Sequence, residues 1–379
     1  MMRFVLAPDS FKESMTAKEV CIAMEKGIKK VFKDATCIHV PMADGGEGTL
    51  QSLIDATNGT IYEKEVTGPL GNKVKGKFGI LGTENVAIIE MAQASGIQLV
   101  PMNKRNPLIT TTYGTGELIK EALNKGVKKI IIGLGGSATN DGGAGMLQAL
   151  GVKFLNDEGN ELLFGGESLK DLKNIDISEM DKRIFNVNIE VACDVKNPLI
   201  GENGATKVFA KQKGASEKDI DILENSLKNY SEVVLKALGK NINVEGAGAA
   251  GGLGAALLGF CNAKLLKGID IVIKYSLLKE KIKDADYVFT GEGSIDFQTK
   301  FGKTPIGVAS LAKSFNIPVI ALAGRVGEGT SDLYNLGITS IFGILKEATT
   351  LEEALKKGPE NIERTTENIC RLLKEIKLI

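Results

Sequence analysis

The chain has 379 residues, 43% of them hydrophobic, so it can bury one large core or, as we expect, two cores of ordinary domain size. Basic and acidic residues number 47 each, which leaves no net field to attract a polyanion, and nucleic acid is therefore not an expected partner. The opening apolar run is too short for a signal peptide, and the longest uncharged stretch is glycine-rich and too short to span a membrane. We expect a cytoplasmic protein with no membrane partner.

The first sixty residues alternate between strand and helix patterns. They predict strands over 3–7 and 36–42 and helices over 16–32 and 48–56. This β-α-β-α order is typical of a parallel sheet. From 60 to 94 the pattern changes to short apolar runs separated by glycine turns, which predicts antiparallel hairpins.

The middle of the chain predicts helices over 116–124, 218–239 and 253–260 and strands over 129–132 and 189–192. From residue 285 onward, strands and helices alternate again as they do at the N-terminus. We therefore predict two dissimilar α/β domains. One is Rossmann-like, with a parallel sheet built from both termini, over 1–62 and 281–379. The other, over 63–280, is an inserted mixed α/β domain with glycine-rich phosphate-binding loops.

Four glycine-rich loops follow predicted strands. The fullest, over 130–146, reads I-I-I-G-L-G-G-S-A-T-N-D-G-G-A-G-M and leads into a helix-like segment. The others read A-D-G-G-E-G-T (43–49), G-A-G-A-A-G-G-L-G (246–254) and T-G-E-G-S (290–294). Loops without side chains let backbone N–H groups approach a phosphate, and a helix N-terminus adds partial positive charge. For any single loop, glycines that only permit a tight turn are the alternative.

Acidic, hydroxyl and basic side chains gather at the same predicted strand ends. A magnesium-bound phosphoryl donor needs carboxylates or hydroxyls for the metal, amides or lysine for phosphate, and a base or positioning group for the acceptor. Any of these acids could instead cap a helix, and the lysines could be solvated. Candidates for metal or acceptor are Asp9, Ser10, Asp44, Glu47, Asp194, Glu292 and Asp296; candidates for countercharge are Lys12, Lys303 and Arg325.

No Walker sequence is present, and no dinucleotide fingerprint follows the first predicted strand. The residues alone therefore indicate a two-domain α/β enzyme that handles a phosphorylated ligand with magnesium.

These motifs resemble the bacterial glycerate kinase family, of the glyoxylate-pathway type, over essentially the whole chain. The resemblance implies transfer of the γ-phosphoryl group of ATP to D-glycerate, with Mg²⁺, giving 2-phosphoglycerate or 3-phosphoglycerate. The matching segments are A-P-D-S-F-K (7–12), A-D-G-G-E-G-T (43–49), T-Y-G-T-G-E-L-I (112–119), G-G-S-A-T-N-D-G-G-A-G-M (135–146), C-D-V-x-N-P-L (193–199), G-A-G-A-A-G-G-L-G-A (246–255) and T-G-E-G-x-x-D-x-Q-T (290–299).

The resemblance also implies residue roles. The nucleotide phosphates would be bound at Gly135, Gly136, Ser137, Asn140, Asp141, Gly142, Gly143, Gly248, Gly251 and Gly252. Glycerate would be bound by Asp9, Ser10, Lys12, Asp44 and Glu47, and the metal by Asp194, Glu292 and Asp296. Arg325, predicted from its own place at a strand end, is the further candidate for binding glycerate. Catalysis would rest on Lys12 and on Asp194 or Asp296, one of which would accept the hydroxyl proton.

Three positions depart from the family pattern. Glu13 replaces a glycine, Ala210-Lys211 replaces Gly-Pro, and Ser294 stands where many members carry arginine. The last departure bears on substrate preference, because a guanidinium is a natural partner of a carboxylate or phosphate.

Two other classes of function stay open from the sequence. An NAD-dependent oxidoreductase acting on a small hydroxy acid would suit the α/β opening, but it usually needs a catalytic histidine, and the only histidine is His39. A non-catalytic sugar-acid-binding sensor would bind glycerate without turnover. The expected partner is the small-molecule substrate, and a homodimer is an assembly that the sequence leaves open.

Overall fold

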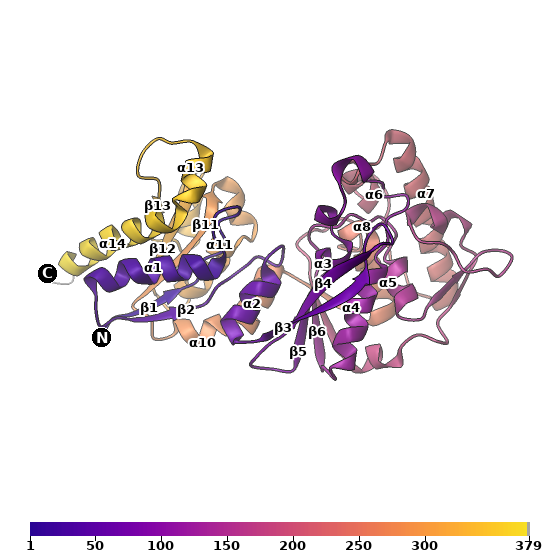
Figure 1. The fold of residues 1–379 in the computed structure, drawn as a ribbon, viewed down its shortest axis with the longest axis horizontal. Helices are drawn as coiled ribbons and strands as arrows, with labels where there is room; N and C mark the ends of the chain where they lie inside the picture. Colours follow the sequence, from indigo (N-terminus) through magenta and orange to yellow (C-terminus); the bar gives the residue numbers. More distant parts are fainter. Residues whose placement is uncertain (377–379) are drawn as a thin grey trace. The chain divides into compact units, whose positions relative to one another are not determined.

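A computed structural model describes residues 1–376 (Figure 1). The described chain divides into two compact units. Unit 1 comprises Met1–Asp44, Gln51–Gly59 and the described residues from Ile269 onward. Unit 2 comprises Gly45–Leu50 and Thr60–Gly268. Each unit has its own sheet.

Within residues 1–376, unit 1 contains a five-stranded sheet in the order β13-β12-β11-β1-β2, and every neighbouring pair is parallel. The N-terminal strand β1 therefore pairs with β11, which lies in the last third of the chain. The predicted parallel sheet built from both termini is confirmed. The strands are β1 (Arg3–Leu6), β2 (Thr36–His39), β11 (Tyr287–Ile295), β12 (Val319–Val326) and β13 (Ser340–Gly343).

Helices α1 and α14 pack against each other in unit 1 (Figure 1). Phe4 and Leu6 of β1 share a hydrophobic cluster with residues of both helices, because alternate side chains of a strand face the same side. The helical segments of this unit are α1 (Ala17–Val31), most of α2 (Thr49–Thr57), α9 (Gly268–Tyr275), α10 (Leu278–Ile282), α11 (Thr304–Lys313), α12 (Ser331–Asn335), α13 (Leu351–Lys356), α14 (Gly358–Ile376) and the 3-10 turn η6 (Phe297–Phe301).

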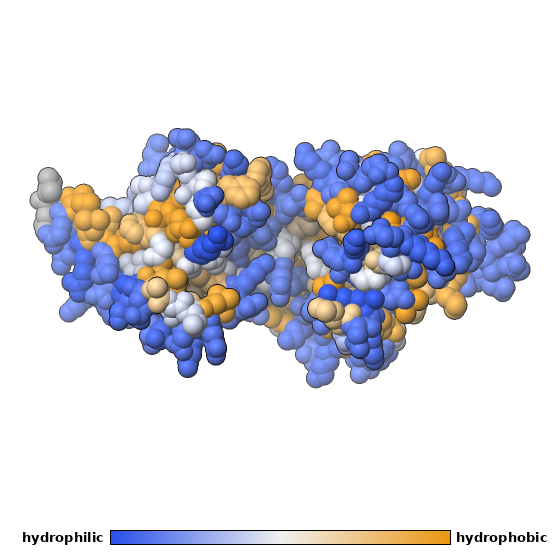
Figure 2. Space-filling model, turned by 90° about the horizontal axis from the view of Figure 1, so that it is seen from above, coloured by the Kyte–Doolittle hydropathy of each residue, from blue (hydrophilic) through white to orange (hydrophobic). Residues whose placement is uncertain are grey.

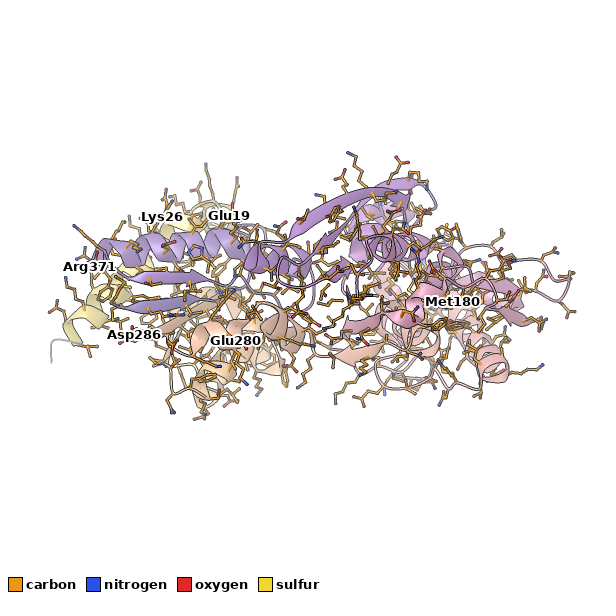
Figure 3. All side chains as sticks on the ribbon, turned by 90° about the horizontal axis from the view of Figure 1, so that it is seen from below. Glu19, Lys26, Met180, Glu280, Asp286 and Arg371 are labelled. Carbon is orange, nitrogen blue, oxygen red and sulfur yellow. The ribbon has the colours of Figure 1, made fainter. Side chains whose placement is uncertain are left out.

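A glycine on α1 sets how closely α14 approaches. A Cβ added to Gly27 would lie 2.4 Å from the main-chain oxygen of Glu363 and 2.8 Å from Cβ of Thr366. Lys30 of α1 also forms ion pairs with Glu363 and Glu367 of α14. Other charged residues of the two helices are exposed, among them Glu19 and Lys26 on α1 and Arg371 on α14, which Figure 3 labels.

Within the described chain, unit 2 contains a six-stranded mixed sheet in the order β10-β9-β6-β5-β4-β3. The β3–β4 and β4–β5 pairs are antiparallel and the others are parallel. The predicted hairpins over 60–94 and the mixed α/β class are thus confirmed. The strands are β3 (Thr60–Thr67), β4 (Lys73–Ile80), β5 (Val86–Glu90), β6 (Lys129–Gly133), β9 (Asn188–Ala192) and β10 (Lys264–Leu266), with a separate hairpin of β7 (Lys153–Leu155) and β8 (Asn174–Asp176).

The helices of unit 2 pack around one hydrophobic cluster. Helix α4 begins three residues earlier than predicted, because Gly114 and Gly116 permit close packing that their weak helix propensity does not reveal. Helix α8 is interrupted by left-handed residues Ala250 to Gly252 and continues from Leu253, where the sequence predicted its start. The segments are α3 (Ala92–Ser95), α4 (Tyr113–Asn124), α5 (Ala144–Ala149), α6 (Ala205–Phe209), α7 (Glu217–Leu238), α8 (Ala249–Cys261) and 3-10 turns η1 (Ile97–Leu99), η2 (Met102–Lys104), η3 (Gly166–Asp171), η4 (Lys182–Asn186) and η5 (Lys211–Lys213).

The unit boundaries differ from the predicted ones at 62/63 and 280/281. Strand β3 starts at Thr60, which moves the first boundary to Gly59. Helices α9 and α10 belong to unit 1 from Ile269 on: Lys281 donates to the main-chain oxygen of Ala56 at 3.2 Å, and the Ile269 side chain fills the space beside Gly307. The loop 45–50 belongs to unit 2, a division inside a single motif that the sequence pattern did not indicate.

Hydrophilic residues cover most of the face shown in Figure 2, and apolar residues form scattered patches between them. Among residues 1–376, none of the helices combines the length and the apolar character needed to cross a bilayer.

The Gly27 contact predicts a stability effect. Replacing Gly27 with alanine favours an isolated helix by about 1 kcal/mol, but here the added methyl group collides with α14 backbone, and overpacking costs about 1–3 kcal/mol. We expect G27A to lower the urea midpoint of unfolding. Lys26→Ala, on an exposed position of the same helix, is the control and should change it little. A G27A midpoint equal to or above that of the wild type would contradict the close packing.

Candidate active site

The candidate site residues fall into two groups, one in each unit. In unit 2 they lie after β6, after β9, in the loop that precedes α2 and at the start of α8; in unit 1 they lie after β1, at Asp44, along the end of β11 and on β12. The positions after β1, β6 and β9 and at the ends of β11 and β12 are carboxyl ends of parallel strands, where α/β sheets bind ligands.

The loop after β6 has an open side and a buried side. Gly135 and Gly136 are exposed, whereas residues 137–143 are buried. The amide N–H groups of Gly135, Gly136 and Ser137 donate no hydrogen bond to any acceptor within residues 1–376. The carbonyl oxygen of Gly136, in contrast, accepts from the N–H of Ile97 at 2.8 Å. The open side therefore presents amide donors, which is the chemistry that an anion requires.

Asn140 and Asp141 lie on the buried side of this loop. The Asp141 carboxylate accepts from the N–H and hydroxyl of Thr112, both at 2.8 Å, and from the N–H groups of Gly143 and Gly145. Burial raises its pKa. Asn140 donates to the hydroxyl of Thr206 at 2.9 Å. Both side chains thus shape the loop from behind, and their contact with a nucleotide stays a prediction.

The glycines of the 246–254 segment support the same loop. Gly251 has a φ of +66°, and a Cβ on it would lie 2.0 Å from the carbonyl oxygen of Thr139. Its own carbonyl oxygen accepts from the N–H of Gly142 at 3.0 Å. Gly248, Gly251, Gly252 and the facing Gly142 and Gly143 are all buried, so they provide close packing of backbone on backbone.

A second loop lies beside the first. A Cβ on Gly135 would be 3.4 Å from the Cα of Gly46, in the A-D-G-G-E-G-T segment. Glu90, at the end of β5, accepts from the N–H of Leu50 at 2.8 Å and from that of Gly48. Burial raises the pKa of Glu90, which is 6% exposed. Its side chain fixes the second loop on the sheet.

Asp194 follows β9 on the same sheet. Its Oδ1 accepts from the N–H of Gly268 at 3.1 Å, and Gly268 in turn is in close contact with Gly45. Asp194 and Glu47 are both exposed. Unit 2 thus brings together the loop after β6, the 45–48 loop and two exposed carboxylates.

Unit 1 holds a cluster of carboxylates with hydroxyl and ammonium partners. Glu292 Oε1 accepts from the hydroxyl of Thr299 at 2.9 Å, and its Oε2 lies 3.6 Å from Nζ of Lys303. Asp9 accepts from the hydroxyl of Thr304 through Oδ2 and from the N–H of Ser10 through Oδ1. Thr299 and Thr304 are fully buried, so they hold both carboxylates in place.

The environment shifts both carboxyl groups toward neutral pH. Burial raises the pKa of Glu292 to about 7, and the charge of Asp9 adds to the rise. Burial, with the charge of Asp44, raises the pKa of Asp9 to about 6. Carboxyl groups with such values can exchange protons at physiological pH.

The other predicted residues of unit 1 have simpler surroundings. Lys12 and Arg325 are exposed, and Lys12 backbone lies beside Gly293. Arg325 on β12 stands opposite Ser294 on β11 in the strand register. Asp296 caps η6, with its Oδ1 accepting from the N–H of Gln298 at 2.8 Å.

The predicted metal ligands are divided between the units. Asp194 belongs to unit 2, whereas Glu292 and Asp296 belong to unit 1. Within residues 1–376, no three histidine, cysteine, aspartate or glutamate side chains form a group that could hold a metal ion. Magnesium in nucleotide sites keeps several waters and takes only one or two protein carboxylates, a need that Asp194 and Glu47 fit.

Sequence reasoning missed Glu90, Thr299, Thr304 and the buried Lys213. Glu90 closes an apolar strand in V-A-I-I-E, and a carboxylate at a strand end was a usable signal. Thr304 carried none, because its partner Asp9 lies 295 residues away, whereas Thr299 lies in the same T-G-E-G-x-x-D-x-Q-T motif as its partner Glu292.

Comparisons with known proteins agree along the chain. The profile of the glycerate kinase family matches residues 4–374. The glycerate kinase of Bacillus subtilis is 52% identical over 99% of each chain, and the glycerate 2-kinase of Escherichia coli K12 is 52% identical over 98% of each. A crystal structure from Salmonella typhimurium LT2, of a protein assigned as glycerate kinase 2, matches with a TM-score of 0.91 at 48% identity, covering 100% of this chain and 99% of that one. This chain belongs to the glycerate kinase family.

Proposed function

We propose that this protein is a glycerate kinase, which transfers the γ-phosphoryl group of ATP to D-glycerate with Mg²⁺ and releases 2-phosphoglycerate and ADP. Membership of the family over residues 4–374 carries the proposal. Transfer to the 2-hydroxyl group is supported by the Escherichia coli relative, which is named for that position and is 52% identical.

The proposal assigns the nucleotide phosphates to unit 2. The amide groups of Gly135, Gly136 and Ser137 have no acceptor among residues 1–376 and can donate to phosphate oxygens. The nucleotide would arrive as its magnesium complex, whose charge offsets that of the phosphates. Asp194 and Glu47, both exposed, would hold the water shell of that ion.

The proposal assigns glycerate to unit 1. The exposed cations Lys12 and Arg325 would bind its carboxylate, and the Asp9–Glu292 cluster would bind its hydroxyl groups. We place the catalytic base at Glu292. Both oxygens of Asp9 already accept hydrogen bonds, and the Asp296 side chain caps η6. The polar neighbour of Glu292 Oε2 within residues 1–376 is Lys303, whose Nζ lies 3.6 Å away.

In the reaction, the 2-hydroxyl oxygen of glycerate forms a bond to the γ-phosphorus as the bond from that atom to the β-γ bridging oxygen breaks. Glu292 takes the hydroxyl proton, and ADP leaves. Lys303 stabilises the carboxylate form of Glu292 before the transfer, and Thr299 keeps it oriented.

The activity itself is tested with the purified protein, D-glycerate and MgATP. We expect ADP formation that depends on glycerate, with ³¹P NMR showing 2-phosphoglycerate. A 3-phosphoglycerate signal would overturn the assigned position and leave the kinase reaction intact. NADH production from glycerate and NAD, without ADP formation from ATP, would instead indicate an oxidoreductase.

The base is tested with Glu292→Gln, which keeps the acceptor for Thr299 but cannot accept a proton. We expect kcat to fall about 10²-fold or more. Because the pKa of Glu292 is about 7, kcat/KM of the wild type should fall tenfold for each pH unit below that value, where the carboxyl is protonated. The E292Q profile should lose this limb.

The melting temperature of E292Q shows whether its loss of activity comes from misfolding. A carboxyl whose pKa is raised by burial destabilises the fold when it ionises, so E292Q should match or exceed the wild-type melting temperature at pH 8. Glu328→Gln, at an exposed acid of the same unit, should retain full activity. Wild-type kcat in E292Q would remove Glu292 as the base.

A further inference from the structure

Lys213 is a lysine in an unusual place. It ends η5, is 3% exposed and lies in unit 2 behind the loop that follows β6. Its Nζ donates to the carbonyl oxygen of Thr139 at 2.8 Å. Burial lowers its pKa to about 7, opposed by the charge of Asp141. Burying an ammonium group is costly, so the position calls for a physical reason.

Lys213 belongs to a set of donors that bind three carbonyl groups of this loop, those of residues 136, 138 and 139. The N–H of Ile97 donates to the carbonyl oxygen of Gly136 at 2.8 Å. The hydroxyl of Thr110 donates to the carbonyl oxygen of Ala138 at 2.9 Å, and the ammonium group of Lys213 donates to that of Thr139. Thr110 is fully buried. The carbonyl groups are thereby held at the back of the loop.

The amide groups behave in the opposite way. Those of Gly135, Gly136 and Ser137 find no acceptor among residues 1–376. A trans peptide plane carries the carbonyl of one residue and the N–H of the next on opposite sides, so the bond from Ile97 to the Gly136 carbonyl orients the N–H of Ser137. The bonds from Thr110 and Lys213 fix the next planes along the chain, at 138–139 and 139–140, and so anchor the buried end of the loop. The exposed end has glycine at positions 135 and 136, where no side chain restrains the backbone, so its position depends on that anchor.

We propose that Lys213 and Thr110 are positioning residues, which anchor the buried end of the loop at 138–140 so that its exposed end, with the amides of 135–137, keeps its place against the nucleotide phosphates. This inference rests on the proposed function in placing a nucleotide at the loop. Neither residue touches the nucleotide. The ligand class is a nucleoside di- or triphosphate with its magnesium ion.

The test uses Lys213→Met, which keeps the length of the side chain and removes its donor, and Thr110→Val, which removes the hydroxyl at constant volume. The matched control is Lys211→Met on the same 3-10 turn, because Lys211 is exposed and pairs with Glu217. Affinity for MgADP is measured by calorimetry without glycerate, and KM values for MgATP and D-glycerate are measured by turnover.

We expect K213M and T110V each to weaken MgADP binding about tenfold or more, the scale set by losing a buried hydrogen bond. KM for MgATP should rise in parallel, while KM for D-glycerate should stay within twofold. K211M should match the wild type in all three.

Three results would overturn the inference. The first is wild-type MgADP affinity in K213M. The second is an equal rise of both KM values, which describes general loosening of the fold. If K213M fails to fold, the T110V variant provides the test instead. Wild-type affinity of T110V for MgADP is then the third result that would overturn the inference. Absence of glycerate turnover in a wild-type protein that binds MgADP would overturn the proposed function alone.

Discussion

The pairing of β1 with β11 is the interaction on which unit 1 depends. It joins the first residues of the chain to a strand near residue 290, and the hydrogen bonds continue beyond the ladder: the N–H of Asp9 donates to the Gly291 carbonyl at 2.8 Å. The hydroxyl of Thr290 donates to the carbonyl of Ala7 at 2.9 Å. This pairing brings Asp9 beside Glu292. Burial raises the pKa of both acids, and the charge of Asp9 raises that of Glu292 further, while the charge of Asp44 raises that of Asp9.

The two units make their binding surfaces from different parts of the residue. Unit 1 relies on side chains, whose carboxylates are oriented by buried threonine hydroxyl groups. Unit 2 relies on main-chain amides at the exposed end of the loop after β6, whose buried end is anchored from behind. A side-chain cluster suits proton transfer to and from a small hydroxy acid. Fixed amides suit phosphate, because they carry partial charge at no ionisation cost.

Much of the fold could be predicted from the sequence because its signals are local. The change from helical periodicity to short runs near residue 60 located the hairpins of β3 to β5, and the return of the α/β rhythm near residue 285 indicated the sheet shared by both termini. Helices α13 and α14 were not predicted, although Ile362 and Ile369 stand seven residues apart on the buried side of α14. The β7–β8 hairpin was also missed, since its strands have three residues each and carry too short a pattern.

The candidate site was predicted less well, because residue type does not reveal burial. The sequence predicts that Asn140 and Asp141 face a ligand. In the structure both are buried and form hydrogen bonds to other residues of the protein. Glu90 read as part of a strand, yet it fixes the 45–48 loop. The motif A-D-G-G-E-G-T reads as one loop, yet Asp44 belongs to unit 1 and Gly45 to unit 2. These assignments depend on contacts between residues far apart in sequence.

The interrupted course of unit 1 has a consequence for how the protein is made. A ribosome finishes β1, α1 and β2 early, but about 250 further residues pass before β11 supplies the central partner of β1. At about 5–20 residues per second, that interval is about 12 to 50 s. Unit 2 is complete within it, whereas the apolar N-terminal segment emerges long before the strand that shields it. The nascent chain therefore folds from the middle outward, and its first forty residues are the part that most needs protection by chaperones during synthesis.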